Sequence, residues 1–273
     1  MSRTLALPSW LNRHTLNTSA VVVGGVGVVA ALIIWLSAAM TQMQYRDAMA
    51  KTNAVDASNN ALITKENAYT SAAKNTATSD TEFDSATEQY NASITAYTAK
   101  VTALKNSWVV SDQSVQGSYT AFMKKHDSFV SANAERETVM AALRQVTLHC
   151  SKQTLGAMDT SDLSKLSEAY EKTFTPCVKA ITTLANAKNT TVGAVGKQYA
   201  SYFSDVKART EAMQAAYAAG DRTKFEAEYK QFLNLAESIT TYTDMSKIYT
   251  YYRDILPGNE LTLLTTLLAQ KVA

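Results

Sequence analysis

Proline and glycine are scarce in this sequence, with three and nine copies among 273 residues. Because these residues interrupt regular secondary structure, their scarcity favours long helices. Cysteine is scarcer still, since only Cys150 and Cys177 are present. Two cysteines cannot build a disulfide-dense small fold, and a chain of this length can form a hydrophobic core without a structural metal.

Catalytic and cofactor motifs are also absent from the sequence. It contains no HExxH zinc motif, no Glu-x-x-His pair of the di-iron bundles, no GxSxG nucleophile turn and no phosphate-binding loop. The three histidines, His14, His126 and His149, are too dispersed to suggest a shared metal site. We therefore expect a non-catalytic protein without a metal or other cofactor.

The sequence beyond the N-terminal region has no excess of basic or acidic residues. The formal net charge is +2, and the basic residues other than Arg3 and Arg13 equal the 24 acidic ones in number. A neutral domain offers no electrostatic basis for holding phosphates. Nucleic acid is therefore not an expected partner.

One long uncharged run, Ser19–Met40, stands near the N-terminus. As a helix rising about 1.5 Å per residue it would extend roughly 33 Å, enough to cross a hydrocarbon core of about 30 Å. The alternative is a cleaved signal, because Ser37 and Ala39 place small residues before a cut that would release a secreted protein. Apolar regions of signal peptides span only about 7–15 residues, so a retained anchor is favoured.

Charges beside this run predict its orientation. Arg3 and Arg13 precede it, and the first acidic residue is Asp47. Positive residues in short segments stay in the cytoplasm. We therefore expect a cytoplasmic tail over residues 1–18, a single transmembrane helix over 19–40 and an extracytoplasmic domain from residue 41. The composition, rich in Thr, Ser and Ala, suggests a bacterial cell envelope.

Small residues share one face of the expected span. They are spaced by three or four positions, an arrangement that lets membrane helices approach closely; they are Ala20, Gly24, Gly27 and Ala31. This face predicts pairing with another membrane helix, although glycine and alanine are also common in spans without such a role.

Beyond the run, apolar residues follow a helical period throughout. The clearest pattern is a heptad seam formed by Phe83, Thr87, Tyr90, Ile94, Tyr97, Val101, Leu104 and Trp108. Ser79 and Glu82 have the spacing of a capping box at its start. The sequence predicts an all-α fold in which the transmembrane helix precedes an elongated antiparallel helical bundle with heptad packing.

The expected segments of this bundle differ in their apolar surface. Residues 41–76 carry a polar seam that predicts a stalk or a lightly packed helix, and 77–256 form the main bundle. Within it we expect a single helix over 118–150 and a new helix beginning at Pro176. Residues 257–273 form a leucine-rich helix.

Cys150 and Cys177 both lie on the expected outer side of the membrane. An oxidising compartment favours a disulfide between them. Two buried free thiols are the alternative. A metal site is disfavoured because His149, next to Cys150, has no further ligand at a suitable spacing.

Three groups of residues could contact partners or ligands. Tyr242, Tyr249 and Tyr252 cluster in one predicted helix, and tyrosine is enriched at protein interfaces, although it also suits the edge of a core. The face formed by Leu261, Leu264 and Leu268 could fold back onto the bundle or dock a partner. His126, Asn133 and Arg136 interrupt an apolar stripe, where they set the helix register or line a ligand notch.

Two functions fit these features. The first is a non-catalytic scaffold, adaptor or complex subunit, held by lipid at residues 19–40 and bound to other envelope proteins or to a second copy. The second is a ligand-binding module without its own output domain, because the architecture resembles the helical sensor modules of bacterial receptors. Those receptors use a second membrane span and a cytoplasmic output domain, which this sequence lacks.

Overall fold

The computed structural model describes the backbone of residues 13–151, 154, 156–238 and 245–273. Side chains are described from residue 41 onward within these ranges, except that of Ser238. Every regular element in the described ranges is helical, which confirms the all-α fold. The elements are α1 (Arg13–Lys74), α2 (Asp80–Lys105), the 3-10 turn η1 (Trp108–Ser111), α3 (Gln113–Asn133), α4 (Arg136–His149), the 3-10 turn η2 (Leu163–Lys165), α6 (Leu166–Ala185), α7 (Thr190–Ala218), α8 (Arg222–Ser238), α9 (Met245–Asp254) and α10 (Asn259–Val272).

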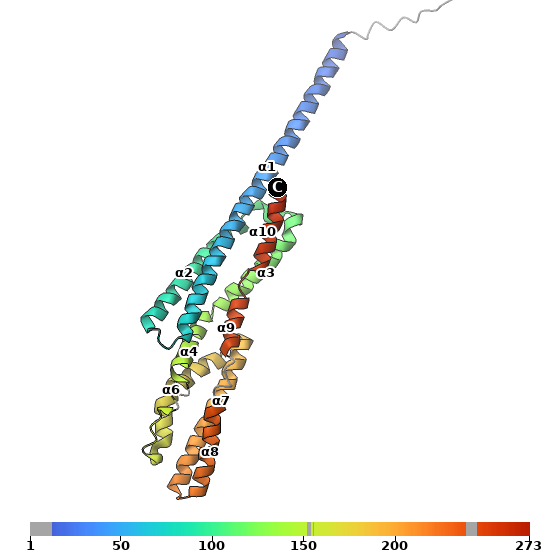
Figure 1. Ribbon diagram of the computed structural model, residues 1–273. Helices are drawn as coiled ribbons and strands as arrows, with labels where there is room; N and C mark the ends of the chain where they lie inside the picture. The colour runs from blue at the N-terminus through green and yellow to red at the C-terminus, as the bar shows by residue number, and fades with distance from the viewer. Residues whose placement is uncertain (1–12, 152–153, 155, 239–244) are drawn as a thin grey trace, which may run out of the picture.

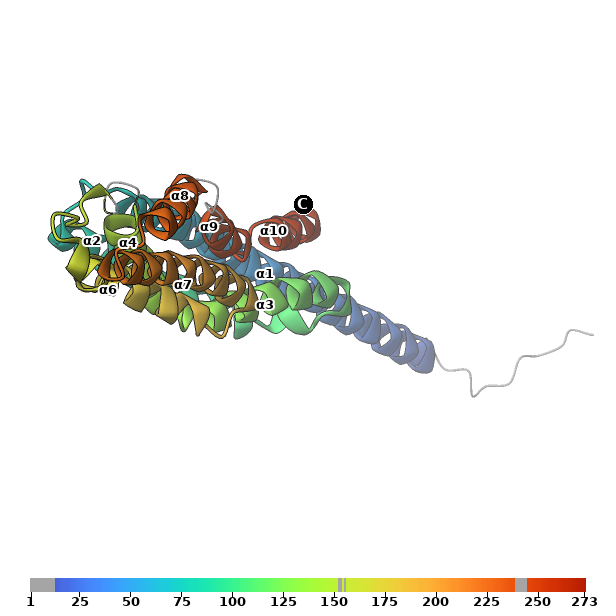
Figure 2. The same cartoon turned by 90° about the horizontal axis from the view of Figure 1, so that it is seen from below.

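The helices form two groups stacked end to end (Figure 1). The upper group contains the C-terminal part of α1 with α2, α3 and α10, and the lower group contains α6, α7 and α8. Helix α4 contacts both α1 and α6, and α9 lies between the two groups. The N-terminal part of α1 projects beyond the upper group, as the view along the bundle also shows (Figure 2).

The expected membrane span coincides with this projecting part of α1. The side chains of Ser19–Met40, including Ala20, Gly24, Gly27 and Ala31, lie outside the described residues. Among the residues that are described, no helix has both the length and the apolar character needed to cross a membrane.

The C-terminal half of α1 is the central helix of the upper group. The prediction that this segment is a stalk or a lightly packed helix is wrong, because every residue of the polar seam is at most 2% exposed: Ala48, Thr52, Val55, Asn59, Leu62, Glu66, Tyr69 and Ala73. Helices α2, α4 and α10 pack around this seam. Its polar members are buried because they find partners, such as the Pro257 carbonyl, which accepts a hydrogen bond from Asn59 at 2.8 Å.

Helix α2 begins and packs as its local sequence predicts. The Ser79 hydroxyl accepts from the Glu82 amide, and the Glu82 carboxylate accepts from the Ser79 amide at 2.7 Å, so the capping box is confirmed. The seam residues are buried or half-buried as far as Leu104. Trp108 departs from the prediction, because α2 ends at Lys105 and this side chain is 54% exposed.

Two helix boundaries differ from the predictions. The single helix expected over 118–150 is divided into α3 and α4 next to Glu135, whose carboxylate accepts the amide hydrogens of Lys188 and Asn189 at 2.9 Å each. Pro176 does not begin a helix but lies inside α6. Proline inside a helix removes one hydrogen bond and crowds the carbonyl four residues earlier, and the packing of α6 against α4 and α7 outweighs this cost.

Helices α6 and α7 approach closely at Gly196. A Cβ atom at this position would overlap the backbone of α6 at Ala185. Only glycine therefore permits this crossing distance.

The last helix folds back onto the upper group. Leu261, Leu264 and Leu268 are at most 1% exposed, and α10 packs against α1 and α3. The C-terminus consequently lies beside α1, near the point where α1 leaves the bundle (Figure 1).

Candidate functional site

A cluster of buried polar and aromatic side chains lies where the two helix groups meet. We call it the junction cluster. It comprises Glu66 and Tyr69 from α1, Tyr90 from α2, Asn133 from the end of α3, Arg136 from the start of α4 and Tyr252 from α9. Five helices thus meet around one charged centre.

Arg136 is the centre of the cluster, and its side chain is 1% exposed. Its guanidinium forms an ion pair with the carboxylate of Glu66, which is 3% exposed, and donates a hydrogen bond to the Tyr90 hydroxyl at 2.8 Å. The guanidinium carbon also lies 4.6 Å from the ring centroids of both Tyr90 and Tyr252. A buried cation is therefore neutralised by one carboxylate and held between two aromatic faces.

Further contacts surround this ion pair. The Tyr90 hydroxyl donates to Asn133 Oδ1 at 2.9 Å, and the Thr70 hydroxyl donates to Glu66 Oε1 at 2.9 Å. The rings of Tyr69 and Tyr90 stack with centroids 5.2 Å apart. The contacts of Tyr90 with Asn133 and with Tyr69 join α2 to α3 and to α1, and they help to fix the relative positions of these helices.

Burial controls the protonation of the three tyrosines. It raises the pKa of Tyr69 to about 12, and it also raises the pKa of Tyr90 and Tyr252. All three hydroxyls therefore keep their protons at neutral pH. They can donate hydrogen bonds but are poorly suited to act as general bases.

Some buried atoms of the cluster have no partner among the described residues. They include Glu66 Oε2, Arg136 Nε and the Tyr252 hydroxyl. An unpaired buried polar atom normally costs about 1–3 kcal/mol, so these atoms could bind an additional polar group.

The structure brings together only part of the predicted ligand notch. Asn133 and Arg136 both bind the Tyr90 hydroxyl. His126 lies two turns earlier in α3, about 10 Å along the axis, where its Nδ1 is 3.3 Å from the Tyr97 hydroxyl. Burial lowers the pKa of His126, with a smaller lowering by Lys105, whereas Asp127 raises it.

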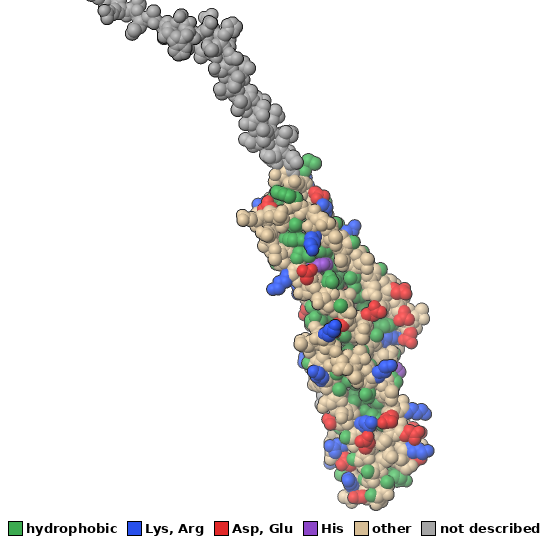
Figure 3. All heavy atoms as spheres, turned by 180° about the vertical axis from the view of Figure 1, so that it is seen from behind, with side chains coloured by type: hydrophobic (Ala, Val, Ile, Leu, Met, Phe, Trp, Pro, Cys, Tyr) green, Lys and Arg blue, Asp and Glu red, His purple; other side chains and the backbone are tan. Residues whose placement is uncertain are grey.

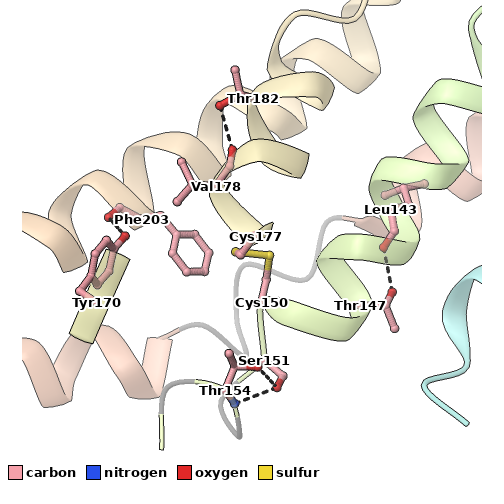
Figure 4. Close-up of a disulfide and its surroundings, with 10 residues drawn as sticks. All are labelled: Leu143, Thr147, Cys150, Ser151, Thr154, Tyr170, Cys177, Val178, Thr182 and Phe203. Carbon is pink, nitrogen blue, oxygen red and sulfur yellow. Dashed lines mark hydrogen bonds between the residues drawn. A yellow bond between two sulfur atoms is a disulfide. The ribbon is translucent and has the colours of Figure 1, made fainter. Parts of the chain in front are cut away.

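The predicted disulfide is present (Figure 4). Cys150, directly after α4, is bonded to Cys177 in α6, with their Cα atoms 5.2 Å apart. Both residues are buried, at 7% and 0% exposure. The bond therefore fastens the end of α4, which begins in the junction cluster, to the lower group.

The tyrosines and leucines predicted to form an interface are not gathered on the described surface. Tyr242 lies outside the described residues, and Tyr252 belongs to the junction cluster. The ring of Tyr249 is half-buried beneath the Lys74 ammonium, which is 4.0 Å from its centroid. The three leucines of α10 are buried in the core.

A groove between α6 and α7, which we call the α6–α7 groove, was not predicted. Its apolar lining consists of Tyr170, Val178, Ile181, Ala200 and Phe203, with Glu171, Lys179 and Lys207 among its polar residues. Val178 is 39% exposed, and Lys207 forms an ion pair with Glu171 at 3.0 Å. An apolar lining beside charged groups suits a protein side chain.

One face of the molecule is mixed in charge. Acidic and basic side chains are interspersed over the face in Figure 3. Within the described ranges, no group of three or more His, Cys, Asp or Glu side chains could hold a metal ion. Comparisons of the chain with protein-family models, with curated proteins and with solved structures find no match.

Proposed function

We propose that this chain is a single-pass membrane protein whose extracytoplasmic bundle acts as a non-catalytic scaffold, adaptor or subunit of a cell-envelope complex. The observation that carries this proposal is the continuity of α1. One helix runs from the uncharged sequence Ser19–Met40 into the centre of the bundle. Anchor and domain would then move as one body, which suits a protein that holds partners in place.

The internal polar groups support a structural role. Glu66 and Arg136 pair with each other, and Arg144 donates to the Thr78 carbonyl and the Asp80 carboxylate at 2.7 and 2.9 Å. Glu135 binds the α6–α7 connection. These contacts hold the helix groups together, which favours binding of partners at the surface.

The α6–α7 groove is the surface that we assign to partner binding. Its partner would be an envelope protein or a second copy of the chain. A photo-crosslinking amino acid at Val178 in intact membranes would test this assignment. Leu233 on α8 is the matched control position, because it is 42% exposed against 39% for Val178 and lies outside the groove.

We expect a discrete crosslinked product from Val178 and none from Leu233, with its mass distinguishing a second copy from another protein. A crosslinked product from Leu233 alone would show that the partner binds the chain, but not at the α6–α7 groove. Monomer alone from both positions would contradict the scaffold function. Retention of the chain in membranes after alkaline extraction tests the anchor separately.

The alternative function, a ligand-binding module, is favoured by one observation. The junction cluster leaves Glu66 Oε2, Arg136 Nε and the Tyr252 hydroxyl unpaired among the described residues. A small polar ligand that binds these atoms would raise the unfolding temperature. Thermal-shift screening with small polar compounds, using Tyr252→Phe as the control, distinguishes this function because a scaffold predicts no shift.

A further inference from the structure

The upper end of the bundle carries exposed apolar side chains. Met43, the third residue after the uncharged run, is 69% exposed, and Trp108 is 54% exposed. Both line one surface hollow, together with Gln44, Asp47 and Lys51 of α1 and with Asn106 and Ser107. The two side chains therefore lie on the same part of the surface, close to the segment of α1 that follows the uncharged run.

The local structure holds Trp108 on the surface. The preceding residue, Ser107, donates its amide hydrogen to the Leu104 carbonyl at 2.9 Å. The following residue, Val109, is fully buried. Both neighbours are held in the bundle, and the backbone between them leaves the indole on the surface.

Basic side chains surround this end of the bundle. Arg46, Lys105 and Lys271 are exposed, and among the described residues none of them has a carboxylate within ion-pair distance. Asp47 pairs with Lys51 at 2.7 Å, and Asp112 accepts a hydrogen bond from the Tyr45 hydroxyl. The hydrogen bond from Tyr45 does not neutralise the Asp112 carboxylate, so three basic side chains face one unpaired carboxylate. The net charge of these groups is positive, as a surface facing lipid phosphates requires.

The depth of these residues follows from helix geometry. In an unbroken helix, Met43 lies about 4.5 Å beyond Met40. The headgroup region on each side of the hydrocarbon core is roughly 5–8 Å thick. If Met40 marks the edge of the hydrocarbon, Met43 lies within the headgroup region and Trp108 lies beside it.

We propose that Trp108 and Met43 insert into the headgroup layer of the membrane, with Arg46, Lys105 and Lys271 facing lipid phosphates. Tryptophan prefers this layer because its ring is apolar and its N–H group can still find a hydrogen-bond acceptor. The bundle would then be seated on the lipid surface as well as anchored through residues 19–40. This inference rests on the proposed membrane anchor.

Fluorescence of the full chain in lipid vesicles tests the contact. Trp10→Phe with Trp35→Phe leaves Trp108 as the sole tryptophan. The vesicles contain phosphatidylcholine and anionic phosphatidylglycerol, with bromine placed either near the glycerol end or near the methyl end of the acyl chains. The control adds Trp108→Phe and Tyr217→Trp, which moves the reporter to the 51% exposed residue near the lower end of α7.

We expect the fluorescence of Trp108 to be quenched most strongly by bromine near the glycerol end of the acyl chains. Its emission should lie at shorter wavelength than that of the control tryptophan, and acrylamide in the water should quench it less. The control tryptophan should be unaffected by bromine. An unquenched Trp108 in a chain that survives alkaline extraction would overturn this inference and leave the anchor intact. If bromine quenches Trp108 but alkaline extraction removes the chain from the membrane, the lipid contact is supported and the anchor is rejected. If Trp108 is not quenched and alkaline extraction also removes the chain, both the lipid contact and the anchor are rejected.

Discussion

Replacing Arg136 by methionine tests whether the junction cluster holds the two helix groups together. Methionine fills a volume similar to the aliphatic part of arginine but carries no charge. The substitution would leave Glu66, whose side chain is 3% exposed, as a buried carboxylate without its cation. It would also remove the hydrogen bond to the Tyr90 hydroxyl and both contacts with the aromatic rings.

The expected loss of unfolding free energy is about 3–5 kcal/mol, the usual cost of removing one partner of a buried ion pair. Most of this loss comes from the uncompensated Glu66 charge. Glu66→Met should cost a similar amount, because it leaves Arg136 unpaired. The double substitution removes both charges and should lie close to the unmodified protein, since a buried ion pair and an apolar pair of similar volume are often equally stable.

Urea unfolding of the full chain in detergent, followed by circular dichroism, measures these free energies. The double-mutant cycle then gives the coupling between the two residues. A loss below about 1 kcal/mol for Arg136→Met, or additive losses in the double variant, would refute the role of the junction cluster in holding the helix groups together.

Three further predictions concern other parts of the bundle. Gly196→Ala should lower the free energy of unfolding by about 3 kcal/mol, because the added methyl group would overlap the backbone of α6. Gly117→Ala should raise it by about 1 kcal/mol, because the methyl group meets no atom within 4 Å and alanine favours a helix. Urea midpoints check both values. Replacing Cys150 and Cys177 together by serine should cost about 3.5 kcal/mol, given their separation of 27, and a thermal transition equal to that of the oxidised protein would contradict this. Because burial lowers the pKa of His126, its contribution to stability is present above the unfolded pKa of about 6.5 and is lost as pH falls through the folded pKa. His126→Gln should therefore reduce the change of unfolding free energy with pH, measured by urea titration at several pH values. An unchanged pH dependence would show that His126 does not cause it.

Features set by neighbouring residues could be predicted from the sequence. The start of α2 follows from Ser79 and Glu82, three positions apart, and its buried face follows from the heptad spacing. The disulfide could also be predicted, because the chain offers only two cysteines.

Features set by distant partners could not be predicted. Glu66 and Asn59 make the seam of α1 look unsuitable for a core, but their partners are Arg136 and the carbonyl of Pro257, far along the chain. No local pattern indicates these pairings. The junction cluster was therefore only partly predicted, through Asn133 and Arg136.

Other errors arose where tertiary packing overrides a local preference. Pro176 favours a helix start in isolation, yet the packing of α6 keeps one helix through it. Trp108 continues the spacing of its seam, but the backbone turns at η1 before the side chain can join the core. The α6–α7 groove was missed for the first of these reasons, because a helix expected to begin at Pro176 does not include Tyr170, Glu171 and Thr175, which line the groove.

The packing of α10 against α1 bears on how the chain folds during synthesis. Helix α10, near the C-terminus, packs along the buried seam, and the hydrogen bond between Asn59 and Pro257 joins positions 198 apart. A ribosome must therefore complete nearly the whole chain before α1 can be enclosed. Until then, the polar seam of α1 should remain hydrated, and a chain released before α10 is made should be an early substrate for proteases or chaperones.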